Sequence, residues 1–534
     1  MSAPTGAGMP LRDHRIHRYV NAFCPRCHEE DPDRRLSEVR RLSGWLAERA
    51  GRVWLERGCP DHGLVSTLYD ESAEILSYLE QWTAPTKVHA PDRLGNFKPV
   101  PSAYEDGLPQ MQTQHTCILL EDITDHCNLK CPTCFAESSP ALAAVAPLAE
   151  VLASVDDRLA KENDRIDVLM LSGGEPTLYP WLEQLLEQLV ARPIVRILIN
   201  SNGLRIANDD AFVATLKKHR ERVEVYLQYD GVSAEASAHH RGADIRRFKE
   251  RAIERLSDAG VFTTLTMTAA LGVNDGEIGA VIDKAIATPY IGGVTIQPVF
   301  GSGRSAGIDP DDRLTHTGVL ARLGPQTDGR ITWRDLTALP CSHPHCCSVG
   351  YFLKDDSGSW KSLVGLIGHD RLKEFLELEP DLIANRIADS NVNKAIRTVV
   401  KNSLLDLLSE QSSLSHPQMS SIWKDICMNC DIGMGTLATL AASKLPGQHR
   451  RLRTMMGERV LRVTVKPFMD INTMIEERLT QCCVHVATVN EGTQAHQCAP
   501  FCAVQAWAPL ARRKIATVAG AQADGRRRLP VTVA

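Results

Sequence analysis

Three cysteines stand close together in the stretch DHCNLKCPTCF, at positions 127, 131 and 134. Clustered cysteines in a reducing compartment indicate metal or iron–sulfur ligands rather than disulfides. A [4Fe–4S] cube normally takes four thiolates, so Cys127, Cys131 and Cys134 would leave one iron open, as a catalytic metal site does. On spacing alone, a three-thiolate zinc site completed by His126 or a distant residue is the alternative.

Alternating strand-like and helix-like stretches run from residue 117 to about 300. The expected strands are CILLEDIT, IDVLMLS, IVRILINS, VEVYLQYD, FTTLTMTA and GVTIQPV, with helical sequence such as WLEQLLEQLV between them. Six strands separated by helices predict a parallel sheet or part of an α/β barrel, which places its chemistry at the carboxyl ends of the strands. The three-cysteine loop follows the first strand. Cys117, inside that strand, is expected to be a small buried hydrophobe.

Polar residues and glycines end the later strands. They are Gly173, Gly174, Glu175 and Pro176 in SGGEP, Asn200, Ser201 and Asn202 in LINSNG, Gln228 and Asp230 in LQYDG, and Gln297 in TIQPVFGSGR. Each taken singly fits ordinary turn chemistry after a strand. The whole set, at successive strand ends, favours one shared site.

The motif CNLKCPTC, followed about 40 residues later by GGEP, resembles the signature of radical S-adenosylmethionine (SAM) enzymes, over roughly residues 115–305. The resemblance implies an α/β fold with a partial (β/α)6 barrel and a [4Fe–4S] cluster whose open iron is chelated by SAM. It implies that GGEP holds the SAM amino group, and that Asn200, Ser201 and Asn202 contact the ribose and carboxylate. Gln228, Asp230 and Gln297 would complete the SAM site, the last near the adenine.

The same resemblance implies the reaction. A reduced cluster injects one electron into SAM, and the resulting 5′-deoxyadenosyl radical removes hydrogen from an unactivated carbon. The cofactor carries this chemistry, so no separate catalytic side chain is assigned. His239 and His240, in SAHHRGAD, are expected at a solvated helix start rather than in the reaction. An electron donor of the flavodoxin or ferredoxin type is the expected partner.

A second ligand set lies near the N-terminus. Cys24, Cys27, Cys59 and His62 offer three thiolates and one imidazole, which suits a closed tetrahedral structural site. The unit over residues 15–83 is expected to be a zinc-ribbon or rubredoxin-like knuckle. The histidine favours zinc, with iron as the alternative. A linker is expected over 84–113, and the core over 114–305.

Cysteines return in the region 306–507, which carries helical sequence and no alternating strand pattern. They are Cys341, Cys346, Cys347, Cys427, Cys430, Cys482, Cys483, Cys498 and Cys502. Two auxiliary four-thiolate cubes would use eight of them. One cube with several free thiols is the alternative. The basic tail, 508–534, is expected to be flexible.

The knuckle, core and cysteine-rich order resembles a branch that contains archaeal tetraether lipid synthases and hydroxymethylpterin methyltransferases. It implies C–C bond formation on a lipid-like substrate, for which the apolar stretch 363–410 could line a channel, or else C-methylation of a pterin-like heterocycle. A multi-cluster electron carrier would not need SGGEP. A zinc-ribbon nucleic-acid binder would need a basic surface, and the net charge is −5.

No apolar run approaches the ~18 residues of a membrane span, and the N-terminus lacks a signal-like stretch, so the expected compartment is the cytosol. Peripheral membrane contact through the basic tail is a further expectation, through Arg512, Arg513, Lys514 and the three arginines from Arg526 to Arg528.

Overall fold

The computed structural model describes residues 15–34, 38–82, 116–162, 164–339, 342–354, 357–370, 457–490, 493–511 and 518–519. The expected linker lies outside these ranges, as do most of the expected tail, Cys341, Cys427 and Cys430. The apolar stretch 363–410 is described only as far as residue 370.

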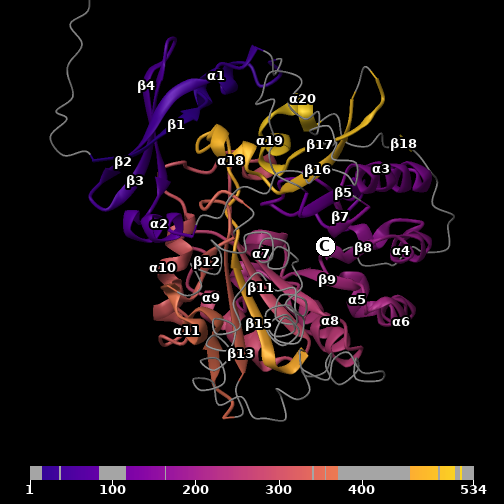
Figure 1. Cartoon of the computed structure of the whole chain (residues 1–534). Coiled ribbons are helices and arrows are strands. Elements are labelled where there is room, and N and C mark those ends of the chain that lie inside the picture. Colours follow the sequence, from indigo (N-terminus) through magenta and orange to yellow (C-terminus); the bar gives the residue numbers. More distant parts are fainter. Residues whose placement is uncertain are drawn as a thin grey trace, which may run out of the picture.

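The N-terminal unit is a four-stranded antiparallel sheet, drawn in indigo in Figure 1. Its strands, in spatial order, are β1 (Arg15–Ala22), β2 (Leu42–Arg49), β3 (Arg52–Cys59) and β4 (Gly63–Asp70). A short helix, α1 (Pro25–Glu30), follows β1, and α2 (Ala73–Glu80) follows β4. Because β1 and β3 are both antiparallel to β2, which lies between them, they end at the same edge of the sheet, where the first cysteines lie.

The core is a run of six neighbouring parallel strands, as the alternating pattern predicts. They are β5 (Ile118–Thr124), β7 (Ile166–Gly173), β8 (Ile194–Ser201), β9 (Val223–Gln228), β10 (Thr263–Ala269) and β11 (Ile291–Pro298). Buried Leu, Ile and Val dominate them because both faces of the sheet are covered.

Helices cover the outer face of this sheet (Figure 1). They include α3 (Leu148–Lys161), α4 (Leu182–Val190), α6 (Asp210–His219), α8 (Arg246–Asp258) and α9 (Ile278–Ala287). Shorter helices, α5 (Leu204–Asn208) and α7 (Ala234–Arg241), follow the ends of β8 and β9, and α10 (His316–Gln326) packs against α2 and α9. The apolar face of each helix packs onto the sheet. This packing fixes the positions of the carboxyl ends of the strands.

The C-terminal region adds strands that its sequence pattern did not predict. These strands are β13 (Ser348–Lys354), β15 (Val460–Val465), β16 (Val484–Val489) and β17 (His496–Pro500). β15 pairs in parallel with β11, and β16 pairs in parallel with β5, so this region extends the core sheet at both edges. In β15, Leu461, Val463 and Val465 alternate with Arg462 and Thr464, and every residue of the strand is buried.

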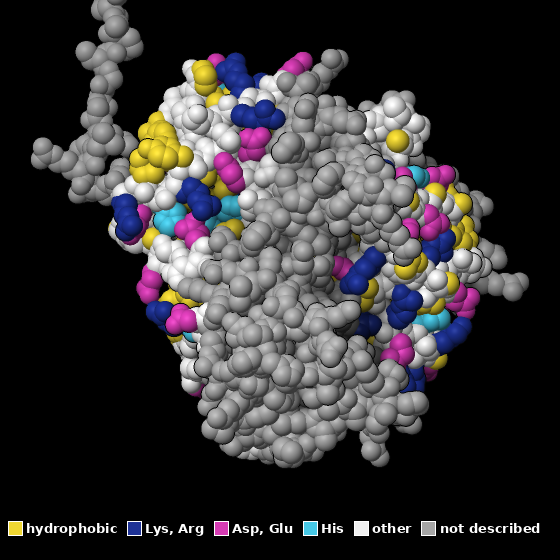
Figure 2. Space-filling model, in the orientation of Figure 1, with side chains coloured by type: hydrophobic (Ala, Val, Ile, Leu, Met, Phe, Trp, Pro, Cys, Tyr) yellow, Lys and Arg dark blue, Asp and Glu magenta, His cyan; other side chains and the backbone are white. Residues whose placement is uncertain are grey.

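The N-terminal sheet shares a core with the inner face of the barrel. One hydrophobic cluster joins Phe23 and Leu46 to Leu120, Val168 and Trp507. On the face shown in Figure 2, side chains of both charge signs are interspersed. Within the described ranges, no helix combines the length and the apolar character that crossing a bilayer requires.

Candidate active site

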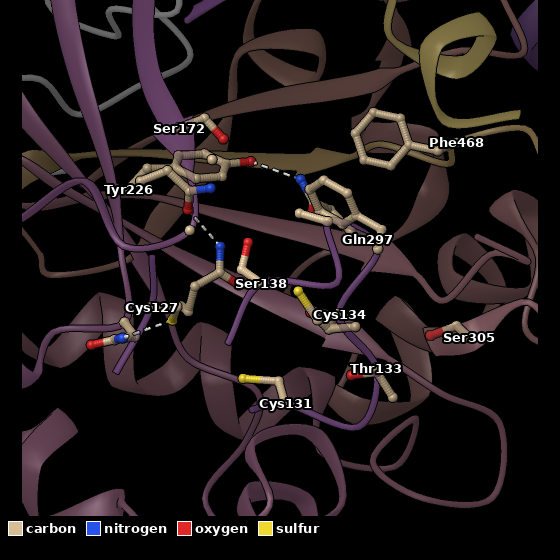
Figure 3. Close-up of a pocket in the computed structure, with 18 of the residues that line it drawn as sticks. Cys127, Cys131, Thr133, Cys134, Ser138, Ser172, Tyr226, Gln297, Ser305 and Phe468 are labelled. Atoms are coloured by element: carbon tan, nitrogen blue, oxygen red, sulfur yellow. Dashed lines mark hydrogen bonds between the residues drawn. The ribbon is translucent and has the colours of Figure 1, made fainter. Parts of the chain in front are cut away.

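The loop between β5 and α3 carries the three predicted cysteines into one cavity. Cys127 and Cys131 are buried and Cys134 is half-buried, and all three line the cavity at the strand ends. Figure 3 shows the three sulfurs gathered on one side of it, below Ser172, Tyr226 and Gln297. The sequence-based grouping of these cysteines therefore corresponds to one place in the fold.

Glycines let the end of β7 clamp this loop. Gly174 N donates to Thr124 O at 2.6 Å, and Glu175 N donates to His126 O at 2.9 Å. A Cβ on Gly174 would lie 2.2 Å from His126 O, and one on Gly173, at φ +110°, would lie 2.3 Å from Thr124 O. Only glycine fits at both positions, so the Gly–Gly pair fixes the start of the cysteine loop.

The turn after β11 holds the other end of the loop. Arg304 donates from its backbone N to Cys134 O at 3.1 Å and from Nε to Cys131 O at 2.6 Å. Its Nη2 also donates to Ser138 O at 2.8 Å. Because backbone carbonyls rather than sulfurs accept these bonds, the cysteine side chains remain available inside the cavity.

Glu175 organises the end of β8. Its Oε1 accepts from the Thr177 and Ser201 hydroxyls at 2.6 and 2.8 Å, and its Oε2 accepts from Asn202 N at 2.7 Å. The residue is 2% exposed. The carboxylate thus joins the ends of two neighbouring strands, a task that the sequence-based interpretation as an acceptor for an ammonium did not include.

A hydrogen-bonded chain crosses the ends of β8 and β9. Gln228 Nε2 donates to Asn200 Oδ1 at 2.7 Å, and Arg241 Nη2 donates to Gln228 Oε1 at 2.9 Å. Arg241 also donates to both oxygens of Asp230, and its Nη1 lies 4.0 Å from Cys131 Sγ. The chain therefore ends in a cation beside a candidate metal ligand.

Asp230 lies behind Arg241 rather than in the cavity wall. Burial alone would raise its pKa, but the charge and hydrogen bonds of Arg241 outweigh burial and lower the pKa to about 2. Asp230 is therefore an anion that orients the Arg241 guanidinium. Pro176 is also absent from the wall; it begins a short 3₁₀ turn after Glu175.

Lys249, on α8, holds the turn that follows β8. Its Nζ donates to Asn202 O at 2.6 Å, and the residue is only 4% exposed. Burial, followed by the charge of Arg241, lowers its pKa to about 7. Asn202 in turn donates from Nδ2 to Asn128 Oδ1 at 2.7 Å, which ties β8 to the cysteine loop.

The sequence predicts a solvated helix start for His240, and the structure shows that this prediction is wrong. His240 lies in the last turn of α7, fully buried, where its Nδ1 is 3.1 Å from Thr133 Oγ1. Burial lowers its pKa to about 4, so the ring is neutral and packs beside the cysteine loop. His239 is exposed.

A family description, "Radical SAM superfamily", matches residues 122–285 of this chain. That range holds the cysteine loop, the Gly–Gly turn and the chain from Asn200 to Arg241. Residues 122–285 therefore form a radical SAM domain. When bound, the [4Fe–4S] cluster of this family supplies one electron and SAM supplies the 5′-deoxyadenosyl group.

The thiols of the radical SAM site fit a cluster. Burial, and then the nearby charge of Glu175, raise the pKa of Cys127 to about 12. Such a thiol stays neutral at ordinary pH unless a metal takes the place of its proton. Cys127, Cys131 and Cys134 would therefore hold the cluster as coordinated thiolates.

The expected SAM contacts mostly line the same cavity. Lining residues among them are Gly173, Gly174, Glu175, Asn200, Ser201, Asn202, Gln228 and Gln297. Arg241, Tyr226 and Phe468 also line it, although no sequence motif marks them. Arg241 stands in the HHRGAD stretch that we set aside, and only the folded helix α7 turns it toward Cys131.

The N-terminal unit of the radical SAM enzyme matches a second family description, "HMPTM N-terminal zinc ribbon domain", over residues 16–71. Cys24, Cys27 and Cys59 Sγ lie 3.5, 3.4 and 3.5 Å from His62 Nδ1. Zn–S bonds of about 2.3 Å and Zn–N bonds of about 2.0 Å give S···N edges of about 3.5 Å in a tetrahedron, so the four groups fit a closed site. His62 Nε2 lies 2.9 Å from Glu30 Oε1, which directs Nδ1 toward the ligand set.

A second cavity is lined by cysteines from distant segments. They are Cys117, Cys346, Cys347, Cys482, Cys483 and Cys502. Cys117, expected to be a buried hydrophobe, is 1% exposed and packs against Cys483. We call this space the cysteine-lined cavity. Five of the expected auxiliary ligands therefore meet in one place.

Cys498 does not line that cavity, although it stands four residues before Cys502. It is fully buried on β17, where Arg158 of α3 and Glu162, the residue after this helix, lie near it. Cys502 is on the helix α19 (Phe501–Ala506) that follows, on the inner side of the sheet. The change from strand to helix separates the two sulfurs.

Buried positive charge faces the cysteine-lined cavity. Arg478 is 5% exposed, and its Nε donates to Cys346 Sγ at 3.3 Å. Within the described part of the chain, no carboxylate lies within ion-pair distance of it. Charges are buried in proteins only when they are balanced. Cysteine thiolates are the available counter-charge, which suits a bound metal cluster.

Relatives of this radical SAM enzyme share its layout to different extents. The 7,8-dihydro-6-hydroxymethylpterin dimethyltransferase of Methanocaldococcus jannaschii is 24% identical over 90% of this chain and 92% of its own length. The mycofactocin maturase MftC of Mycobacterium ulcerans is 26% identical over 35% of this chain and 48% of its own. A crystal structure of Streptococcus suis SuiB bound to the precursor peptide SuiA has a TM-score of 0.34 at 17% identity, covering 40% and 46% of the two chains.

Proposed function

We propose that this radical SAM enzyme catalyses the C-methylation of a small pterin-like heterocycle. The likeness to the M. jannaschii dimethyltransferase carries the proposal, because it spans 90% of this chain. It therefore includes the zinc ribbon and the C-terminal region as well as the SAM-binding core.

C–C joining on a lipid-like substrate was the reaction we first expected from the sequence. Its structural basis was an apolar channel over 363–410, and residues 371–410 lie outside the described ranges. The wall of the cavity beside the cysteine loop includes Ser172, Tyr226, Gln297 and Lys466. Polar groups of this number suit a heterocycle better than an alkyl chain.

The reaction is tested with anaerobically reconstituted, reduced full-length enzyme, SAM and 7,8-dihydro-6-hydroxymethylpterin. We expect 5′-deoxyadenosine and a pterin heavier by one methylene per methyl group added. Deuterated fatty-acyl lipids form the second arm. Deuterium in 5′-deoxyadenosine from the lipid, with an unchanged pterin, would replace the proposal with lipid chemistry.

A triple Ala variant of Cys127, Cys131 and Cys134 is the matched negative control. It should make no 5′-deoxyadenosine while keeping the metal of the zinc ribbon. Parental SAM cleavage by this variant would show that the radical SAM site is elsewhere. We expect a flavodoxin or ferredoxin type protein to serve as the reductant.

The cofactor proposal includes one auxiliary [4Fe–4S] cluster in the cysteine-lined cavity. Cys346, Cys482 and Cys502 are each within electrostatic range of the other two, and Arg478 is near Cys346 and Cys502. Either Cys347 or Cys483 would supply the fourth thiolate. A second auxiliary cluster would have to draw on Cys341, Cys427 and Cys430, which lie outside the described ranges. At the zinc ribbon we propose zinc.

A further inference from the structure

Four phenylalanines from four separate segments meet at the SAM-site cavity. Phe135 follows Cys134, Phe300 follows β11, Phe468 follows β15, and Phe501 begins α19. Ring centroids lie 4.3 Å apart for Phe468 and Phe501, 5.4 Å for Phe300 and Phe468, and 5.4 Å for Phe135 and Phe501. We call these four residues the phenylalanine cluster. All four line the cavity.

Phe135 and Phe468 are half-buried and so leave ring surface open at the cavity. Phe300 and Phe501, which are 7% and 3% exposed, pack behind them. Figure 3 draws Phe468 on the far side of the cavity from the three cysteine sulfurs. Phe468 therefore offers an aromatic surface away from the groups that would hold the radical SAM cluster, whereas Phe135 adjoins Cys134. Flat rings are well matched to such a surface, since offset and edge contacts between rings are favourable.

Polar groups of opposite kind stand beside this surface. Lys466 N donates to Ile296 O at 2.9 Å. Gln297, near the end of β11, and Lys466, directly after β15, therefore lie on neighbouring strands. Gln297 Nε2 donates to Tyr226 Oη at 3.0 Å, which leaves the amide oxygen facing the cavity as an acceptor. Lys466 Nζ, 5.6 Å from the Phe468 ring centre, has no carboxylate partner among the described residues.

We propose that Phe135, Phe468, Gln297 and Lys466 form the substrate seat, and that it takes a flat heteroaromatic ring with an amide-like edge. Lys466 would donate to the ring carbonyl oxygen, and Gln297 Oε1 would accept from the adjacent ring N–H. This inference rests on the proposed function, whose substrate class it specifies. It also assigns Gln297 to the substrate rather than to the adenine of SAM.

The position of the seat agrees with this assignment. Lys466, Phe468 and Phe501 line both the SAM-site cavity and the cysteine-lined cavity. A ring held against Phe468 would lie between the SAM site and the proposed auxiliary cluster. Gln297, Lys466 and Phe468 also fall outside residues 122–285, the range matched by the superfamily description, where specificity rather than shared chemistry is expected.

The seat is tested by direct binding to the full-length, reconstituted enzyme. The probe is 6-hydroxymethylpterin, followed by its own fluorescence under anaerobic conditions. Phe468→Leu, Lys466→Met and Gln297→Leu should each weaken binding of the probe about three- to tenfold, the range expected for one ring contact or one hydrogen bond. SAM affinity, measured by equilibrium dialysis, should change less than about twofold.

Matched controls lie outside the cavity. Phe262→Leu removes a ring that packs on Tyr290 before β10, at the opposite end of the sheet, and Lys361→Met removes an exposed cation on β14 (Trp360–Ser362). Both should bind the probe as the parent does. These variants separate a local effect on the seat from a general loss of packing.

Three results would overturn the seat. Unchanged probe binding in all three seat variants would place the substrate elsewhere. A loss of SAM affinity instead of probe affinity would make the cluster an adenine site. Palmitate binding that depends on Phe468, with no binding of the probe to the parent, would exclude the heterocycle. Failure of the proposed function is a separate result, because the parent enzyme would then bind the probe and leave the pterin unmethylated.

Discussion

Arg241 donates to both carboxylate oxygens of Asp230 and reaches Cys131 Sγ at 4.0 Å with its remaining nitrogen. One buried anion thereby holds a cation beside Cys131, a proposed ligand of the SAM-binding cluster. Since the pair is almost enclosed, with side-chain exposures of 11% and 3%, solvent screens it little.

Arg241→Gln should weaken SAM binding at least tenfold and make the reduction potential of the SAM-binding cluster more negative. The physical reason is that a positive charge beside Cys131 favours the reduced, more negative cluster. Equilibrium dialysis and an EPR-monitored redox titration measure the two effects. Arg246→Gln, at an exposed pair with Asp244 on the next helix, is the control. Parental values for both quantities in Arg241→Gln would refute the role.

A triple Ser variant of Cys346, Cys482 and Cys502 should lose about four irons per chain. SAM binding should persist, because the SAM-binding cluster has its own ligands. Iron analysis with Mössbauer spectroscopy measures the loss. Cys498→Ala is the control, since Cys498 lies on the other side of the sheet, and it should lose no iron. Equal iron loss in both variants would contradict the separation that the structure describes.

His62→Ala should lose one metal ion and lower the thermal midpoint of the zinc ribbon, because three thiolates and the imidazole close that site. Zinc and iron are counted separately by elemental analysis. His28→Ala, in the same unit but outside the ligand set, should retain the metal. One iron in place of zinc in the parent would correct the proposed metal without altering the ligand set.

Glu121→Gln should change how the stability of the enzyme depends on pH. Glu121, on β5, is fully buried, and burial raises its pKa to about 8 although Ser154 donates to it at 2.7 Å. The pKa of a glutamate in an unfolded chain is about 4.3. Its protonation therefore stabilises the fold fully below pH about 4.3, and this contribution is lost as pH rises to about 8.

The slope of that loss is about 1.4 kcal/mol per pH unit inside this window. Relative to the parent, Glu121→Gln should gain thermal stability between pH 5 and about 8, measured by differential scanning fluorimetry. Glu150→Gln, at an exposed site on α3, should run parallel to the parent. A constant difference between Glu121→Gln and the parent across the window would show that Glu121 does not titrate there.

Local patterns predicted much of the site because its ligands come in short motifs. Cys127, Cys131 and Cys134 share one loop, and Gly173 and Gly174 share one turn, so their spacing is visible in the sequence. Arg241 and Phe468 were missed because the fold, not a motif, brings them to the cavity. Their neighbours there, Cys131 and Phe300, lie more than one hundred residues away along the chain.

The cysteines of the C-terminal region were harder to group from the sequence. Cys498 and Cys502 are close along the chain, but one lies on a strand and the other on a helix, and only Cys502 lines the cysteine-lined cavity. β15 was missed although its pattern is typical of a strand, since Leu461, Val463 and Val465 alternate with Arg462 and Thr464.

One stretch of chain, residues 466–483, connects the two strands that border the core: β15 beside β11 and β16 beside β5. The parallel core thus relies on the C-terminal region for both of its outer neighbours. A protein ending at residue 305 would retain all six core strands and every ligand of the SAM-binding cluster. Two rows of backbone N–H and C=O groups would nevertheless face water, and such rows template pairing between molecules. The SAM-binding half is therefore expected to associate with itself when expressed alone.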